Sequence, residues 1–195
     1  MQCENVAGQV MEVYGDLDRH IEESRLRSGL HCIAGCGACC ESTEVEATIG
    51  ELLPLAFRLW HAGTASERLR LVEGGPQHSR CVLYEPTRGR PGFGRCGVYP
   101  YRPLVCRLFG FSTRLNKQGT PRLVTCRLIR RSAETAEAGE QPQPDVDCFP
   151  IMGAYATRVY AIEPSLGRLE PINEALRGAL TYVGFRLGLQ EAAAR

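Results

Sequence analysis

The chain has 195 residues, 44% of them apolar, and a formal net charge of +1 at pH 7. This length and composition can bury one core, and the ten cysteines are too sparse for a small disulfide scaffold. No run of residues approaches the roughly 18 apolar residues of a membrane helix, and the N-terminal residues lack the continuous apolar stretch of a secretory signal. We therefore expect a single cytoplasmic domain over residues 1–195, without a membrane partner.

The positive charge is confined to one part of the chain. Residues 80–131 hold eleven arginines and Lys117 against the single acid Glu85, whereas the segments on either side are acidic overall. The weak net charge, and the absence of a strip that alternates aromatic and basic residues, argue against a nucleic-acid partner.

The N-terminal segment is predicted to be a long helix. Apolar residues from Val6 to Ile21 recur at the spacing of one helix face, which predicts a helix over 5–27. Gly29 is expected to lie near its C-cap, because glycine accepts the left-handed conformation that often ends a helix. The cysteine-rich segment that follows is expected to be irregular.

Two further helices are predicted before the basic segment. The pattern over 48–61 indicates a helix in which Pro54 either produces a kink or moves the start. Ser66 is a candidate N-cap for a short helix through Val72, and the Gly-Gly-Pro sequence at 74–76 would stop it.

The basic segment is predicted to contain a β-hairpin. Residues 81–85 and 95–99 have the composition of short strands, and the glycines and prolines of 86–94 are typical of a long connecting loop. Residues 104–109 are expected to form one helical turn.

The C-terminal third is predicted to contain a mobile loop over 133–147 and a last helix over 173–190 that begins at Asn173 as N-cap. The apolar side of this helix is assigned to Leu176, Leu180, Val183, Leu187 and Leu189. Together these elements predict an α+β fold that is mostly helical, with a short hairpin packed among helices around an irregular region stapled by metal.

Cys32, Cys36, Cys39 and Cys40 place four thiols within nine residues. In a chain without a secretory signal, clustered cysteines are more often reduced metal ligands than disulfide partners, although disulfides or a redox pair remain the alternative. Cys36 and Cys39 have the C-x2-C spacing, which lets two thiolates bind one ion from a tight turn.

The neighbouring residues refine this interpretation. Gly35 and Gly37 lack a Cβ atom, so their backbone N–H groups are expected to approach coordinated sulfur. Adjacent side chains point in different directions, so we expect Cys39 and Cys40 to reach different ions or different irons of a cluster. Two metal centres, or one cluster plus one ion, would use more thiols than these four.

The basic segment supplies four more thiols. The hairpin should bring Cys81 near Cys96, and the proline-containing turn should bring Cys106 toward them, with Cys126 downstream. Each of these cysteines has an arginine beside it; the four are Arg80, Arg95, Arg107 and Arg127. Such arginines can stabilise an anionic thiolate site, but each taken singly is better interpreted as a solvated surface charge.

The cysteine spacing resembles a known family. Cys32-x3-Cys36-x2-Cys39-Cys40, followed by Cys81-x14-Cys96-x2-Tyr99 and by Arg102-Pro103-x2-Cys106-Arg107, is similar to the YkgJ-type cysteine-cluster proteins, described as a zinc- or iron-chelating domain. The resemblance covers residues 32–126. It implies eight metal ligands, namely Cys32, Cys36, Cys39, Cys40, Cys81, Cys96, Cys106 and Cys126.

The resemblance bears on function as well. Related motifs in bacterial flagellin lysine methylases are associated with an iron–sulfur cluster, but this chain shows no glycine-rich loop for S-adenosylmethionine, so their activity is not carried over. We expect an iron–sulfur protein, with a [4Fe–4S] cluster in a redox or enzyme-supporting role and an unidentified redox or enzyme partner. The alternatives are a zinc-stabilised structural or interaction module without redox activity, and a metal-dependent enzyme with an open coordination position.

Four other residues are secondary candidates. Cys148 competes with Cys126 as the last ligand, because it follows the predicted mobile loop. His31 and His78 lie near Cys32 and Cys81 in the sequence, but surface or supporting roles suit them better than coordination. Cys3 is expected to be a free thiol.

Overall fold

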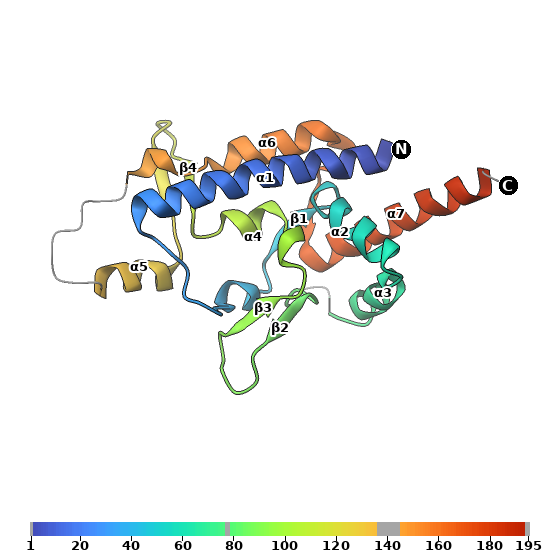
Figure 1. The fold of residues 1–195 in the computed structure, drawn as a ribbon, viewed down its shortest axis with the longest axis horizontal. Helices are drawn as coiled ribbons and strands as arrows, with labels where there is room; N and C mark the ends of the chain where they lie inside the picture. Colours follow the sequence, from blue (N-terminus) through green and yellow to red (C-terminus); the bar gives the residue numbers. More distant parts are fainter. Residues whose placement is uncertain (1, 77–78, 136–144, 194–195) are drawn as a thin grey trace.

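The computed structural model describes residues 2–76, 79–135 and 145–193 (Figure 1). Its α-helices are α1 (Gln2–Ser28), α2 (Ile49–His61), α3 (Ala65–Glu73), α4 (Leu104–Leu108), α5 (Arg127–Thr135), α6 (Met152–Ile162) and α7 (Ile172–Ala193). The strands are β1 (Glu46–Thr48), β2 (Tyr84–Pro86), β3 (Gly94–Cys96), β4 (Ser112–Leu115), β5 (Pro121–Val124) and β6 (Leu169–Pro171). Short 3-10 turns are η1 (Ala38–Glu41), η2 (Tyr99–Tyr101), η3 (Val146–Cys148) and η4 (Pro164–Leu166).

The helices form the body of the molecule, and the strands pair only locally. In Figure 1, α1 and α6 run side by side, α2 packs on α1 and α7, and the β2–β3 hairpin projects from the helical body. All three strand pairs are antiparallel: β1 with β6, β2 with β3, and β4 with β5. This confirms the predicted mostly helical α+β class with a short hairpin.

Helix α1 buries one apolar face, as its periodicity predicts. Val10, Tyr14 and Leu17 are at most 1% exposed, and the Tyr14 hydroxyl donates a hydrogen bond of 2.8 Å to the backbone oxygen of Glu51. The same cluster contains residues of α4 and α6, namely Leu104, Leu108, Tyr155 and Val159. The N-terminal helix therefore supports the segment that carries Cys106.

The second half of the core lies between α2 and α7. A capping box opens α2: Thr48 Oγ1 accepts from the Glu51 N–H, and the Glu51 carboxylate accepts from the Thr48 N–H. On α7, Leu176, Leu180 and Val183 are fully or almost fully buried.

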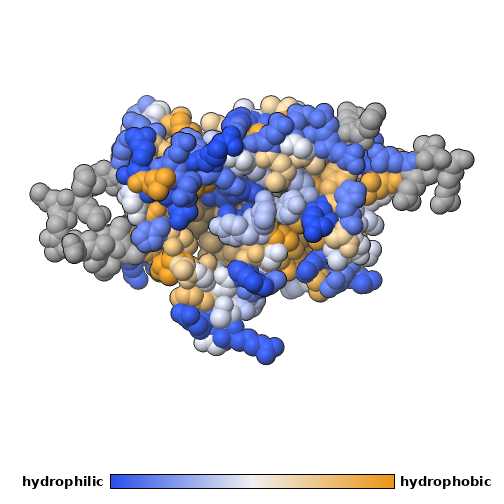
Figure 2. Space-filling model, viewed as in Figure 1, coloured by the Kyte–Doolittle hydropathy of each residue, from blue (hydrophilic) through white to orange (hydrophobic). Residues whose placement is uncertain are grey.

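The face shown in Figure 2 is largely hydrophilic, with its apolar residues in separate patches, because the apolar faces of α1, α2 and α7 turn inward. Among the described residues, no helix has both the length and the apolarity needed to cross a membrane.

Several predicted elements are confirmed with small shifts. The long first helix, the helix that contains Pro54, the single turn of α4 and the hairpin are all present. Gly29 follows α1 at φ +69°, and its N–H bonds to the Arg25 oxygen, as expected for a C-cap.

Other predictions are wrong in detail. Thr64, not Ser66, is the N-cap of α3. Asn173 lies inside α7 rather than at its cap, because β6 leads directly into a helix that begins at Ile172. Leu189 is 49% exposed, so it lies outside the buried face of α7.

Only the two ends of the predicted mobile loop over 133–147 lie within the described residues. Residues 133–135 belong to the end of α5, and 145–147 lead into and form part of η3. The remaining residues, 136–144, lie outside the described residues. The sequence patterns also missed α5 and α6. They missed the β1–β6 and β4–β5 pairs because three- or four-residue strands are too short to show alternation.

Candidate metal centre

The first cysteine segment is held against the hairpin by backbone hydrogen bonds. Gly37 N–H donates to the Gly92 oxygen at 2.8 Å, and Gly94 N–H donates to the Gly35 oxygen at 3.0 Å. Cys36 lies in the bridge that these bonds form with Phe93. The segment carrying Cys32 to Cys40 is therefore docked on the loop between β2 and β3, although about fifty residues separate them.

A tyrosine ring fits between two glycines at this junction. A Cβ atom at Gly37 would lie 2.5 Å from the Tyr84 hydroxyl oxygen, and one at Gly94 would lie 2.5 Å from Tyr84 Cε2. The Tyr84 hydroxyl donates to the Phe93 oxygen at 3.1 Å. Both glycines are needed for close docking. The Gly37 N–H was predicted to approach sulfur, but it donates to the Gly92 oxygen instead.

The other three nearby thiols come from the hairpin and α4. Cys81 lies in a turn before β2, since the Tyr84 N–H donates to its backbone oxygen at 3.1 Å. Cys96 lies on β3, directly opposite Tyr84. Cys106 is in α4.

Asn173 of α7 fixes the backbone around Cys81. Its Oδ1 accepts from the Val82 N–H at 3.0 Å, and its Nδ2 donates to Ser79 Oγ at 3.0 Å and to the Arg80 oxygen at 3.1 Å. Asn173 is 4% exposed. A buried amide thus satisfies three polar groups of the turn that presents this thiol.

The thiols interact electrostatically across segments. Burial, together with the neighbouring charges of Cys81, Cys96 and Cys39, raises the pKa of Cys106 to about 12. Burial likewise raises the pKa of Cys81 to about 11, with a smaller contribution from Cys96. A hydrogen bond between the vicinal thiols raises the pKa of Cys40 and lowers that of Cys39. Five thiols therefore share one electrostatic neighbourhood.

A second neighbourhood surrounds Cys32. Its pKa is raised first by burial, and then by the proximity of Cys36, Cys39 and Cys126. Cys39 thus interacts with Cys32 on one side and with Cys106 on the other. All eight predicted ligands are connected in this way.

Four of the sulfur atoms receive backbone N–H groups. In three cases the donor is two residues further along the chain: Leu83 for Cys81, Val98 for Cys96 and Leu128 for Cys126, the last at 3.4 Å. The fourth is Cys39, which receives the N–H groups of Cys39 and Cys40. Hydrogen bonds of this kind favour the thiolate and are typical partners of coordinated sulfur.

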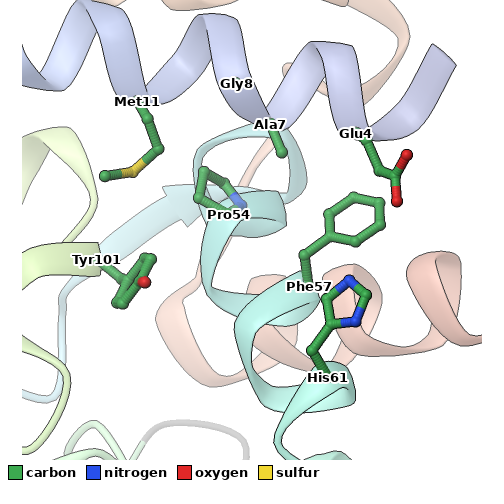
Figure 3. Close-up of a pocket in the computed structure, with 8 residues that line it drawn as sticks. All are labelled: Glu4, Ala7, Gly8, Met11, Pro54, Phe57, His61 and Tyr101. Atoms are coloured by element: carbon green, nitrogen blue, oxygen red, sulfur yellow. The ribbon is translucent and has the colours of Figure 1, made fainter. Parts of the chain in front are cut away.

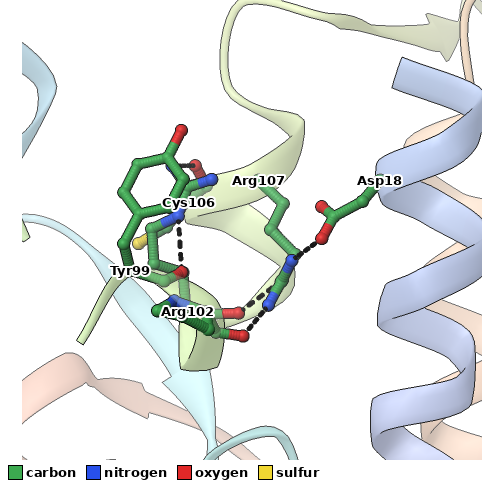
Figure 4. Close-up of polar contacts among 6 residues, drawn as sticks. Asp18, Tyr99, Arg102, Cys106 and Arg107 are labelled. Atoms are coloured by element: carbon green, nitrogen blue, oxygen red, sulfur yellow. Dashed lines mark hydrogen bonds and ion pairs between the residues drawn. The ribbon is translucent and has the colours of Figure 1, made fainter. Parts of the chain in front are cut away.

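Arg102 lies beside Cys106 (Figure 4) and acts on three of the thiols. Its charge favours the thiolates of Cys39, Cys96 and Cys106 and partly offsets the pKa increase that burial causes in the last two. Its guanidinium lies 3.5 Å from the ring centroid of Tyr99, and its Nη1 donates to the Cys106 oxygen at 3.3 Å. In the sequence, Arg102 stands out only as part of a motif, because three residues lie between it and the nearest cysteine.

Arg107 is not the solvated charge that its position beside Cys106 suggested. Arg107 is 4% exposed, and its guanidinium is ion-paired with Asp18. It also donates to the Arg102 oxygen at 2.7 Å and to the Pro100 oxygen at 2.5 Å (Figure 4). Arg107 therefore fixes the turn before α4.

The other three predicted arginines are exposed, as expected; they are Arg80, Arg95 and Arg127. Arg95 pairs with the Glu85 carboxylate at 2.7 Å on the outer face of the hairpin.

The nine cysteines with described side chains are all free thiols. Within residues 2–76, 79–135 and 145–193, no three His, Cys, Asp or Glu side chains form a group that could hold a metal ion as it stands. The thiols thus lie within electrostatic range of one another without forming a closed coordination sphere. Their number, their shared neighbourhoods and their N–H partners fit a thiolate-bound metal group.

The secondary candidates are placed differently. Cys148 is 5% exposed, in an apolar cluster with Phe111, Ile129 and Phe149, and Arg27 and Asp145 are its charged neighbours. His31 contacts the Gly29 oxygen at 3.0 Å. His78 and the Cys3 side chain lie outside the described residues. Cys126 packs against the same apolar cluster as Cys148 and is also a neighbour of Cys32.

A surface pocket of about 220 Å³ lies between α1 and α2 (Figure 3). Phe57 and His61 stack there at 6.3 Å between ring centroids, and Tyr101 contributes from η2. Its lining contains no cysteine among the described residues, so it is separate from the thiols.

Comparison with known proteins identifies the cysteine-rich region. The model of the CxxCxxCC family, described as a zinc- or iron-chelating domain, matches residues 31–143, more than half of the chain. No curated protein and no solved structure matches the chain. The matched region includes all eight predicted ligands, and the chain belongs to the CxxCxxCC family of zinc- or iron-chelating domains.

Proposed function

We propose that the chain is a cytoplasmic iron–sulfur protein in which cysteines bind a [4Fe–4S] cluster, with a redox or enzyme-supporting role. The ligands are drawn from Cys32, Cys36, Cys39, Cys40, Cys81, Cys96, Cys106 and Cys126. The family match supports metal binding by zinc or iron, and the iron–sulfur assignment is our extension of it.

The observation that carries the proposal is the gathering of thiols from separate segments, since backbone hydrogen bonds hold the segment of Cys32 to Cys40 against the hairpin that carries Cys96. Cys40, Cys81 and Cys106 are each held toward the protonated form by burial or a thiol hydrogen bond, and by neighbouring sulfur. Several adjacent thiolates require a positive counter-charge, and metal coordination deprotonates a thiol outright. Their gathering from separate segments is best explained by a bound metal group.

The surroundings of the thiols favour a redox role. The reduction potential of a cluster depends on the hydrogen bonds to its sulfur atoms and on the local charge. Here four thiols receive backbone N–H groups, and Arg102 supplies a nearby positive charge. A bound cluster would supply one-electron transfer, while these residues would hold it and set its potential.

The two neighbourhoods suggest how the ligands divide. Cys32, Cys36 and Cys126 form one group, and Cys40, Cys81, Cys96 and Cys106 form the other, with Cys39 acting electrostatically on both. We propose that the vicinal pair Cys39–Cys40 joins two metal centres or two irons of one cluster. This would explain why the two thiols are adjacent.

Anaerobic purification tests the metal assignment. We expect a brown protein with an absorption shoulder near the blue end of the visible spectrum, together with stoichiometric iron and acid-labile sulfide. A colourless protein with stoichiometric zinc and no sulfide would reject the iron–sulfur proposal and favour the zinc-stabilised module.

A matched pair of variants tests the ligand assignment. Cys106→Ala should lose the chromophore and the metal, because Cys106 interacts with three other thiols. Cys148→Ala removes a buried thiol from an apolar cluster and should keep the metal. Retention of full metal content by Cys106→Ala would remove this residue from the site.

A further inference from the structure

A larger cavity, of about 560 Å³, lies between α1, α4, α6 and the segment around β1. Its volume falls in the range of roughly 300–1,000 Å³ that is typical of sites for small molecules. Much of its wall is apolar and includes Val10, Leu104, Leu108, Met152, Val159 and Leu166. Helix α4 contributes to this wall and also carries Cys106, so the cavity borders the thiol region without containing a cysteine in its described lining.

The charged groups in the described lining of the cavity are mainly carboxylates. Glu44 and Glu46 are exposed, and Glu163 is half-buried and accepts a hydrogen bond of 2.5 Å from Ser165 Oγ. The one cation in the described lining is Arg114, whose Nε lies 3.3 Å from Met152 Sδ. These three carboxylates against one guanidinium give the cavity a negative potential.

A fourth carboxylate in the lining is not available to a ligand. Both oxygens of Glu51 accept backbone N–H groups, from Thr48 at 2.7 Å and from Leu104 at 2.9 Å. Glu51 therefore builds the wall, and recognition falls to Glu44, Glu46 and Glu163.

We propose that this cavity binds a small amphipathic cation, a molecule with a hydrocarbon body and an ammonium group. Removing the apolar wall and the hydrocarbon from water favours binding in proportion to the area covered. The ammonium group would lie near the three carboxylates, whereas a carboxylate ligand of the same shape would be repelled. This site is independent of the proposed metal function.

Three probes with the same hydrocarbon chain separate shape from charge. The full-length protein, with its metal as purified, is titrated with hexylamine, hexanol and hexanoate, and binding is followed by calorimetry and by methyl NMR shifts. We expect saturable binding of one hexylamine, weaker binding of hexanol and no binding of hexanoate. Equal binding of hexylamine and hexanoate, or hexylamine shifts that do not saturate, would overturn the proposal.

Two alanines of α6 provide a matched pair of variants. Both Ala154 and Ala156 are exposed, but only Ala156 lines the cavity. Ala156→Trp should fill the cavity and abolish hexylamine binding, whereas Ala154→Trp should leave it unchanged. Loss of binding in both variants, or in neither, would place the amine elsewhere and contradict the assignment.

The double variant Glu46→Gln, Glu163→Gln tests the charge. Hexylamine should bind about tenfold more weakly, which corresponds to the loss of two partly exposed charge contacts, with hexanol unchanged. The exposed Glu73→Gln serves as the charge control. Metal content should stay constant in every variant, so failure here is distinguishable from failure of the iron–sulfur proposal. Unaltered hexylamine affinity in the double variant would reject recognition by these carboxylates.

Discussion

The ring of Tyr84 lies so close to Gly37 that a Cβ atom there would stand 2.5 Å from the Tyr84 hydroxyl oxygen. This contact joins the segment with the first four cysteines to the hairpin that carries Cys96. Docking of the two segments therefore depends on the absence of a side chain at one position.

Gly37→Ala should separate these segments. The methyl group would overlap the ring, and overpacking of this kind costs about 1–3 kcal/mol. We expect a lower midpoint of urea unfolding and faster loss of metal to a chelator. Gly153→Ala, on α6 with nothing within 4 Å of its added Cβ, is the control and should be neutral or stabilising.

The Gly37→Ala effect has an internal check. Tyr84→Ala should partly rescue Gly37→Ala, because it removes the ring that the methyl group meets. Additive effects of the two substitutions would show that the contact does not couple the segments.

Arg102→Gln should weaken metal retention. The substitution removes the charge that favours the thiolates of Cys39, Cys96 and Cys106, so protons compete better for these sulfur atoms. We expect roughly ten- to hundredfold weaker affinity in a chelator competition, and metal loss that begins at a higher pH. Arg90→Gln is matched, since Arg90 also stacks on a ring, that of Phe93 at 4.0 Å. Equal affinities for the two variants would deny Arg102 this role.

Arg107→Met should strongly destabilise the fold. The substitution leaves the Pro100 and Arg102 oxygens without their donor and Asp18 without its ion pair. Breaking a buried ion pair on one side costs about 3–5 kcal/mol, and the exposure of Asp18 places the expected loss at the lower end. Arg95→Met, which breaks the exposed pair with Glu85, should cost no more than about 1 kcal/mol in the same urea titration. Similar costs for the two variants would contradict the structural role of Arg107.

Glu51 makes stability depend on pH. Burial raises its pKa above the ordinary value of 4.5, so the folded state binds a proton more readily than the unfolded state does. This contribution to stability is complete below pH 4.5 and is lost as the pH rises through the higher folded pKa.

Glu51→Gln isolates that contribution. The variant should be less stable by about 1–3 kcal/mol, because an amide NH₂ would face a backbone N–H. The stability difference between wild type and variant, measured by urea unfolding at several pH values, should shrink as the pH rises above 4.5. A difference independent of pH would show that the carboxyl group has the same pKa in both states.

Sequence patterns predicted the features that depend on neighbours along the chain. The apolar period of α1 and the helix over 48–61 are local patterns, and both elements are present in the structure. The cysteine spacing likewise identified the family and its eight candidate ligands.

The patterns failed where a tertiary contact decided the role of a residue. Asparagine is a favoured N-cap residue, but Asn173 lies inside α7 and binds the turn around Cys81. Arg107 adjoins a cysteine, yet its guanidinium lies 4.3 Å from the ring centroid of Tyr14, which is far away in the sequence. Tyr84 had no signal of its own, because its role depends on two glycines in other segments.

Asp18 and Asn173 lie outside the region of the family match, on α1 and α7. A fragment excised at residues 31 and 143 would keep every predicted ligand, but it would lose the partners that orient the peptide groups beside Cys81 and Cys106. The two flanking helices therefore hold the chelating region in place, and any minimal version of this protein must include both.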